Sequence, residues 1–228
     1  MITIDKQQKL FLNIARILNK KVTTYAVGGT AMMFLGIKDS TLDIDLVFEN
    51  ENDRDTFKGA IKSLGYREID AIKVYGARRN QPEMLKLNDE RFDLFVVNVI
   101  DFIFSENMQK RAESIHQFGE NLILKIADPH DIILMKCATD RLKDKDDARK
   151  IINLGKIKWE LLVEEAKKQI ELGKDKASFE LGCFLEDLKR EMKVDIPQKV
   201  LDDLFEIVMK QVEEKKKGEY KNKNLFKQ

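Results

Sequence analysis

A chain of 228 residues is long enough for one large domain or two small ones, with a core that needs neither disulfides nor metal ions to stabilise it. Charged residues make up 36% of the chain, yet the net charge is only +1, which argues against a strong long-range attraction to nucleic acid or membrane. Two cysteines and two histidines exclude a disulfide framework or a zinc knuckle, and no apolar run reaches the roughly 18 residues that a membrane span needs.

The first half of the chain alternates short β-rich runs with helical stretches. Leu10, Ile14 and Ile17 recur at helical spacing and predict a first amphipathic helix. Strand patterns are clearest at residues 22–27, 41–48, 92–99 and 122–126, and weaker at 74–77 and 84–87. Further helices are predicted at residues 30–35, 53–64 and 105–118. This alternation predicts a mixed α/β domain over residues 1–125.

After Asp128 the pattern becomes almost wholly helical. Asp128 followed by Pro129 is a typical helix start, because aspartate caps the free backbone N–H groups and proline suits the first helical position. Later helices are predicted at residues 144–154, 158–172, 177–192 and 197–217. The sequence therefore predicts a helical domain over residues 126–228.

Two carboxylates interrupt the apolar run at residues 41–48. Side chains alternate between the faces of a strand, so Asp43 and Asp45 share one face. The other face is apolar and suits a core: Leu42, Ile44, Leu46 and Phe48. Aspartate is disfavoured in strands and two close carboxylates repel, so the pair calls for a compensating cation. Hard oxygen ligands of this kind are what magnesium binds.

A third carboxylate lies in the later strand at residues 92–99. There Phe92, Leu94 and Val96 alternate with Asp93 on the opposite face. If this strand lies beside the first, Asp93 faces the same cations as Asp43 and Asp45. Three carboxylates can hold two metal ions about 3.5–4 Å apart, the arrangement used for in-line displacement at phosphorus.

A glycine pair precedes these acids, between the strand at 22–27 and the short helix that follows. Gly28 and Gly29 let the backbone approach a bulky anion closely, and the first turn of the helix offers free N–H groups. Thr30 adds a hydroxyl donor. We expect these three residues to hold the β- and γ-phosphates of a nucleotide while the metal ions lie at the α-phosphate.

The order of these features resembles the signature of the nucleotidyltransferase superfamily with the DNA polymerase beta-like palm: hydrophobic–Gly–Gly, a spacer, then Asp–hydrophobic–Asp–hydrophobic. Residues 27–29 and 43–46 match it, and Asp93 matches the third carboxylate by its order and strand setting. The resemblance covers roughly residues 25–99. It implies an α/β (α+β) fold in which a small mixed-sheet nucleotidyltransferase palm is followed by a C-terminal helical domain.

The segment after the palm resembles that of minimal transferases of the AbiEii abortive-infection toxin type. In those proteins a basic-Asp-x-x-Asp element follows a helix that carries a lysine; here Lys143, Asp144 and Asp147 match the element and Lys136 the lysine. We expect Lys136 and Lys143 to meet the triphosphate, with the two aspartates orienting them or binding the acceptor. The alternative is a solvated charged turn between helices.

A second basic pair, Arg78 and Arg79, lies in the polar link before Asp93. It suits contact with an acceptor or a phosphate, but such a pair is more often simply exposed.

The resemblance implies a metal-dependent enzyme that transfers NMP from an NTP to a hydroxyl acceptor and releases pyrophosphate. Asp43, Asp45 and Asp93 are the expected catalytic metal ligands, with two Mg²⁺ ions, or Mn²⁺ in their place. The expected acceptor is an RNA end such as that of tRNA, a protein hydroxyl or a small molecule. A cognate antitoxin is a further partner that the toxin type implies. A polar N-terminal segment unlike a signal peptide predicts a cytoplasmic protein with no membrane partner.

Two other functions fit the same sequence. A catalytically inactive binding module, such as a toxin or antitoxin partner, would need no magnesium-dependent triphosphate binding. A metal-dependent phosphoesterase would also use carboxylates, but such sites often add histidine ligands, and neither His116 nor His130 is near the acids in sequence.

Overall fold

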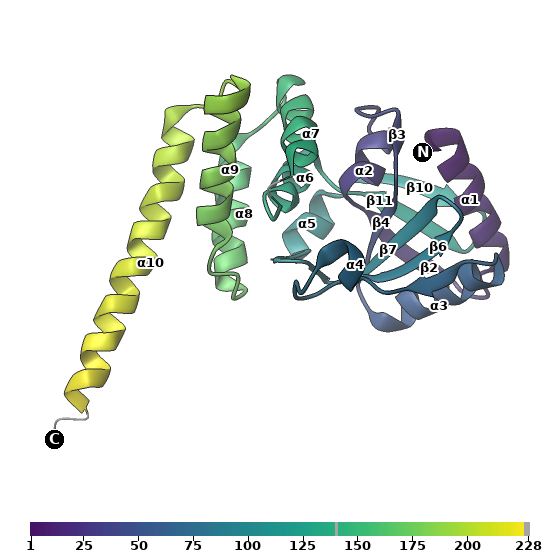
Figure 1. Cartoon of the computed structure of the whole chain (residues 1–228), viewed down its shortest axis with the longest axis horizontal. Coiled ribbons are helices and arrows are strands. Elements are labelled where there is room, and N and C mark those ends of the chain that lie inside the picture. Colours follow the sequence, from purple (N-terminus) through teal and green to yellow (C-terminus); the bar gives the residue numbers. More distant parts are fainter. Residues whose placement is uncertain (140, 226–228) are drawn as a thin grey trace. The chain divides into compact units, whose positions relative to one another are not determined.

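The computed structural model describes the backbone of residues 1–139 and 141–225 and the side chains of those residues up to Lys217. The chain divides into two compact units, Met1–Ala138 and Thr139–Gln228. The first is a mixed α/β unit and the second is helical (Figure 1). The predicted fold class, a small mixed sheet followed by a helical region, is confirmed.

The first unit is built on one mixed sheet in the order β10-β11-β2-β4-β7-β6-β5. Its strands are β2 (Val22–Ala26), β4 (Ile44–Phe48), β5 (Arg67–Ile69), β6 (Glu83–Leu87), β7 (Glu90–Val96), β10 (Ser114–Phe118) and β11 (Leu122–Ile126). The pairs β11–β2 and β4–β7 are parallel and the others are antiparallel. Short strands β8 (Asn98–Val99) and β9 (Phe102–Ile103) continue from β7, and β1 (Ile2–Thr3) pairs separately with β3 (Ser40–Thr41).

Helices pack on the sheet of the first unit. They are α1 (Ile4–Ile17), α2 (Gly28–Phe34), α3 (Glu51–Ser63), α4 (Ile72–Tyr75), α5 (Glu106–Arg111) and α6 (Pro129–Lys136). On one face of the sheet Phe57 of α3 lies between two strand aromatics, with ring centroids 5.4 Å from Phe48 and 5.9 Å from Phe92. The helix α2 contacts β4, and α6 packs against α2.

The second unit consists of α7 (Leu142–Asn153), α8 (Trp159–Glu171), α9 (Ala177–Met192) and α10 (Gln198–Leu225). The helix α9 contacts all three others, and Lys145 joins α7 to α9 through Asp187 at 2.9 Å. Gly182 of α9 lies beside Leu204 of α10, since a Cβ at this glycine would be 3.8 Å from Leu204 Cβ, an ordinary contact distance. Over the described part of the chain, no helix combines the length and the apolar character that crossing a bilayer requires.

Most predicted elements are present, but two segments differ from the prediction. The expected strand at 74–77 is instead the end of α4, where the carbonyl of Ala71 accepts the N–H groups of Val74 and Tyr75 and Gly76 turns the chain at φ 65°. The expected helix at 105–118 stops at Arg111, and β10 then pairs along its whole length with β11. Long-range pairing therefore overrides the local helical pattern.

The structure also contains elements that the sequence patterns did not indicate. The edge strand β5 was not predicted, and the helix α2 begins at Gly28 rather than at Thr30. The helical unit begins after Ala138 rather than after residue 125, because α6 packs against α2 of the first unit.

Candidate active site

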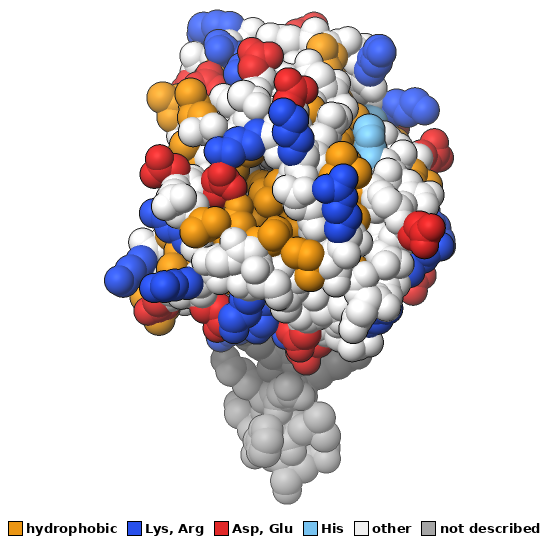
Figure 2. Space-filling view, turned by 90° about the vertical axis from the view of Figure 1, so that its right-hand side faces the viewer, with side chains coloured by type: hydrophobic (Ala, Val, Ile, Leu, Met, Phe, Trp, Pro, Cys, Tyr) orange, Lys and Arg blue, Asp and Glu red, His pale blue; other side chains and the backbone are white. Residues whose placement is uncertain are grey.

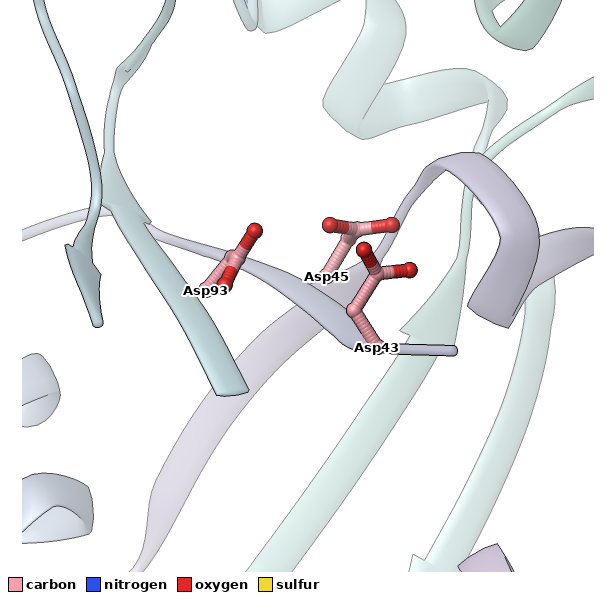
Figure 3. Close-up of side chains that lie close together, drawn as sticks. All are labelled: Asp43, Asp45 and Asp93. Atoms are coloured by element: carbon pink, nitrogen blue, oxygen red, sulfur yellow. The ribbon is translucent and has the colours of Figure 1, made fainter. Parts of the chain in front are cut away.

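Three carboxylates converge on one face of the central strands β4 and β7, which run parallel. The register places Asp45 directly beside Asp93, and Asp43 lies on the bend that leads into β4. One oxygen from each of the three carboxyl groups lies within 4.8 Å of the others. Figure 3 shows the three groups pointing to the same side of the two strands. The arrangement that the strand alternation predicted is therefore present.

The opposite face of the same two strands is apolar and closed. Its side chains are 0–1% exposed: Ile44, Leu46, Phe48, Phe92 and Leu94. Leu42 does not belong to this face, contrary to the prediction, and is 57% exposed. The reason is that the chain bends at residues 42–43 and regular alternation begins only with Ile44.

The negative charges of the three aspartates repel one another. Burial is the main cause that raises the pKa of Asp45 well above its ordinary value, and the charges of Asp43 and Asp93 raise it further, while Arg91 and Lys136 oppose them. The pKa of Asp93 is also raised, chiefly by burial, against the opposing charge of Arg91 and a hydrogen bond from Tyr75. A cation bound to the three aspartates would offset the repulsion and lower both pKa values.

Two side chains that the sequence did not indicate hold Asp93. Arg91 donates from Nε to Oδ1 at 2.8 Å and from Nη2 to Oδ2 at 3.0 Å, and its Nη2 also contacts Asp43 Oδ2. The Tyr75 hydroxyl donates to Asp93 Oδ2 at 2.6 Å. The Asp93 carboxyl group is thus fully buried but hydrogen-bonded on both oxygens.

The glycine pair gives α2 its close approach to the acids. Gly28 adopts φ 54°, and a Cβ at this position would lie 2.8 Å from Asp45 Oδ2. A Cβ on Gly29 would lie 2.6 Å from Thr41 Oγ1, whose hydroxyl donates to Asp43 Oδ1 at 3.3 Å. Any other residue at either position would displace a carboxylate or the group that holds it.

Thr30 differs from the expectation that its hydroxyl would contact a phosphate. The side chain is fully buried, and its Oγ1 accepts the Asp45 N–H at 2.9 Å. Thr30 therefore fixes the backbone of β4 beneath the Asp45 carboxylate and influences the site through that residue.

The predicted basic residues fall into different parts of the molecule. Lys136 ends α6, is 7% exposed and is close enough to Asp45 to lower the pKa of that carboxyl. Lys143 is exposed and belongs to the second unit. Asp144, in the same helix, is buried and accepts a hydrogen bond from Arg141 Nε at 2.7 Å. Asp147, one turn further on, is also buried.

The second basic pair is likewise divided. Arg78 donates to the carbonyl of Ala138 at 2.8 Å, just beyond the end of α6, while Arg79 is exposed. Arg78 therefore joins the link before β6 to the helix that carries Lys136.

The oxygen ligands on the acidic face of β4 and β7 fit a hard divalent cation. Asp43, Asp45 and Asp93 offer carboxylate oxygens only, with no nitrogen or sulfur ligand among them. The close passage of Gly28 leaves no side chain between α2 and Asp45. Magnesium and manganese prefer such oxygen-rich sites.

Comparison with known proteins agrees with this geometry. A family model described as "Nucleotidyltransferase of unknown function (DUF6036)" matches residues 2–193. No curated protein matches the chain.

Solved structures give distant resemblances. A structure of ANT(2")-Ia in complex with adenylyl-2"-tobramycin covers 79% of this chain and 97% of its own, at 17% identity and a TM-score of 0.44. A tRNA-processing enzyme (apo form 2) covers 86% of this chain and 64% of its own, at 15% identity and a TM-score of 0.32. A tRNA nucleotidyltransferase complexed with a primer tRNA and an incoming ATP analog covers 78% and 62%, at 16% identity and a TM-score of 0.28. The chain thus spans less than two thirds of the length of the last two.

The family match covers most of the chain and includes the strands, the glycine pair and all three carboxylates. The chain therefore belongs to the nucleotidyltransferase family of unknown function, DUF6036.

Proposed function

We propose that this protein transfers NMP from a nucleoside triphosphate to a hydroxyl acceptor, with release of pyrophosphate, at the acidic face of β4 and β7. The observation that carries the proposal is the convergence of Asp43, Asp45 and Asp93 within 4.8 Å beside Gly28. Three carboxylates that repel one another are costly unless a cation binds there. Membership of a nucleotidyltransferase family supplies the reaction class.

The three aspartates are the proposed ligands of Mg²⁺, with two ions bound and Mn²⁺ as a substitute. Such ions, when bound, polarise the phosphoryl oxygens and neutralise the charge that develops during transfer. The protein's contribution is to hold the ligands rigidly. Tyr75 fixes Asp93 at 2.6 Å, and Thr41 and Thr30 fix Asp43 and the backbone of Asp45.

The triphosphate is proposed to lie along the start of α2. Gly28 and Gly29 carry no side chain between the α2 backbone and the acids, so phosphate oxygens can approach the backbone N–H groups there. Lys136, whose charge already acts on Asp45, is the proposed cationic partner of the phosphates from this unit. Lys143 keeps its proposed role as a second phosphate ligand.

Asp93 is the proposed proton acceptor for the reaction. The acceptor hydroxyl loses its proton to Asp93 as its oxygen bonds to the α-phosphorus. The bond from that phosphorus to the bridging oxygen breaks, and pyrophosphate leaves. The Tyr75 hydroxyl, which donates to Asp93 Oδ2 at 2.6 Å, holds the carboxylate in position for this step.

The proposed acceptor is a hydroxyl of an RNA end, a protein or a small molecule. Figure 2 shows one face of the molecule on which Lys and Arg side chains are interspersed with Asp and Glu around a central group of hydrophobic side chains. This face has no continuous basic field of the kind that tracks a nucleic-acid backbone. The net charge of +1 disfavours a large RNA interface relative to contact with a single end or a small acceptor.

The test is incubation with each α-labelled triphosphate, Mg²⁺ and fractionated cell extract, followed by identification of the labelled product. We expect transfer of label together with pyrophosphate release, and loss of both in Asp43→Ala and Asp45→Ala. Asp89→Ala, an exposed acid in the β6–β7 turn, is the matched control and should behave as wild type.

The alternative functions give different outcomes in the same assay. Orthophosphate release in place of pyrophosphate would identify a phosphoesterase. Absence of magnesium-dependent triphosphate binding by calorimetry, in wild type and both variants alike, would identify an inactive binding module.

A further inference from the structure

The guanidinium of Arg91 lies among the carboxylates proposed as metal ligands. It holds Asp93 through two hydrogen bonds, at 2.8 and 3.0 Å, and contacts Asp43 with the same Nη2 atom. Its side chain is 21% exposed, so the group is partly withdrawn from water. Arg91 therefore uses one oxygen of Asp43 and both oxygens of Asp93, atoms from the same carboxyl groups that a divalent cation would need.

Each of these carboxylates also has a neutral hydroxyl donor. Tyr75 donates to Asp93 Oδ2 at 2.6 Å, and Thr41 donates to Asp43 Oδ1 at 3.3 Å. Hydroxyl donors orient a carboxylate and leave lone pairs for a metal ion, since an ionised carboxyl group accepts about four hydrogen bonds. The acids are thus held in place by groups that do not oppose a cation, and Arg91 is not needed to orient them.

We propose that Arg91 is the resident counter-cation of the site and competes with the divalent ion for Asp43 and Asp93. The guanidinium cannot lose its proton under physiological conditions, so it yields only by moving away. A cation at the three aspartates repels this positive charge and takes up its acceptors. Arg91 then turns toward the phosphates of the nucleotide, which offer the bidentate oxygen pair that arginine favours.

This inference rests on the proposed function, because it assumes that the aspartates bind a divalent cation. It goes beyond that function because it states whether Arg91 raises or lowers the affinity of the site for the metal ion. A residue that merely positions Asp93 would strengthen metal binding, whereas a competing counter-cation weakens it.

The experiment measures Mn²⁺ affinity of the nucleotide-free protein by paramagnetic titration, with no turnover involved. Arg91→Met removes the charge and keeps a side chain of similar length. We expect it to bind Mn²⁺ about tenfold more tightly than wild type, since the charge-assisted contacts of Arg91 with Asp43 and Asp93 no longer have to be broken. Arg91→Lys keeps the charge but cannot span both carboxylates, so it should fall between the two.

Lys86→Met is the matched control. Lys86 lies opposite Arg91 in the β6–β7 register and is exposed, so the variant removes one positive charge from the neighbouring strand without touching an acid. Its Mn²⁺ affinity should equal that of wild type within twofold. An equal gain in Lys86→Met would show that general charge, not the Arg91 contacts, sets the affinity.

The remaining outcomes separate this inference from the proposed function. Weaker Mn²⁺ binding in both Arg91→Met and Arg91→Lys than in wild type would overturn the competition and leave the metal site standing. Absence of Mn²⁺ binding in wild type and in every folded variant would reject the metal site itself. Circular dichroism of each variant establishes that it is folded.

Discussion

The two faces of the β4–β7 pair are opposite in chemistry, although the side chains on both come from the same two strands and alternate between the faces. One face, with Ile44, Phe48 and Phe92, is fully buried beneath α3. The other carries Asp45 and Asp93, side by side in register, with their pKa values raised chiefly by burial and further by the charges of neighbouring aspartates. Packing on the first face is favourable in itself, whereas the second is unfavourable until a cation arrives.

The comparison teaches that the apolar face supplies the rigidity on which the acidic face depends. Two parallel strands that are bonded in register, and whose Phe48 and Phe92 both pack on Phe57 of α3, cannot move apart to relieve the repulsion. The carboxylates therefore remain preorganised. Strain stored at a functional site in this way is compensated by favourable packing elsewhere.

The largest effect is expected from damage to the apolar face. Phe57→Ala removes the fully buried ring between Phe48 and Phe92 and leaves a cavity, so the free energy of unfolding should fall by about 3–5 kcal/mol. Denaturant titration measures the loss. Phe179→Ala, at a ring 57% exposed on α9, is the control and should change stability by less than about 0.5 kcal/mol. Equal losses in the two variants would contradict the division between the faces.

A change of opposite sign is expected on the acidic face. Asp45→Asn keeps the shape of the side chain and removes a partly buried charge that two neighbouring carboxylates repel. Without metal, the variant should be more stable than wild type by about 1–2 kcal/mol. Denaturant titration in a chelating buffer measures the difference, and excess Mg²⁺ should stabilise wild type only. A metal-free variant less stable than wild type would show that Asp45 is an ordinary structural residue.

The same pair of proteins gives a pH dependence with a defined sign. The folded-state pKa of Asp45 is raised, so its protonated form contributes stability that is fully present below the unfolded-state pKa and is lost as pH rises through the folded-state value. The advantage of Asp45→Asn should therefore shrink as pH falls through the raised value toward the ordinary aspartate range. Parallel unfolding curves at each pH test this, and an advantage that grows on acidification would reverse the assignment.

The acidic face could be predicted from sequence because strand alternation has a period of two. That period placed Ile44, Leu46 and Phe48 opposite Asp45, and Phe92 opposite Asp93. The same rule puts Arg91 on the face of Asp93, two residues away, but alternation alone does not show that its guanidinium bonds the carboxylate. The prediction that Leu42 would be buried was wrong, because the chain bends at residues 42–43 and alternation does not extend there.

Other parts of the site carry no local signal. Tyr75 reaches Asp93 from α4, a single turn whose position depends on long-range contacts such as that from Arg78 to Ala138. The role of Thr30 depends on where β4 lies, which the sequence near Thr30 does not contain. The segment that forms β10 was predicted to be helical for the same reason, because its pairing with β11 depends on the folded sheet and not on the local sequence.

The smallest effect is expected from Tyr75→Phe, which removes one hydroxyl and keeps the ring against Phe95. Asp93 retains both bonds from Arg91, so stability should fall by only about 0.5–1 kcal/mol. Mn²⁺ affinity should fall roughly tenfold, because groups that orient a metal ligand typically contribute that much.

Because Arg91 and Tyr75 bond the same carboxyl group, the double variant Arg91→Met, Tyr75→Phe tests whether one donor can replace the other. Independent effects would return the Mn²⁺ affinity to near that of wild type. Binding much weaker than that would mean that Asp93 needs one of its two donors to keep its position. Arg91 would then act as a counter-cation only while the Tyr75 hydroxyl holds the acid in place, which makes the hydroxyl the condition for the whole exchange between guanidinium and metal ion.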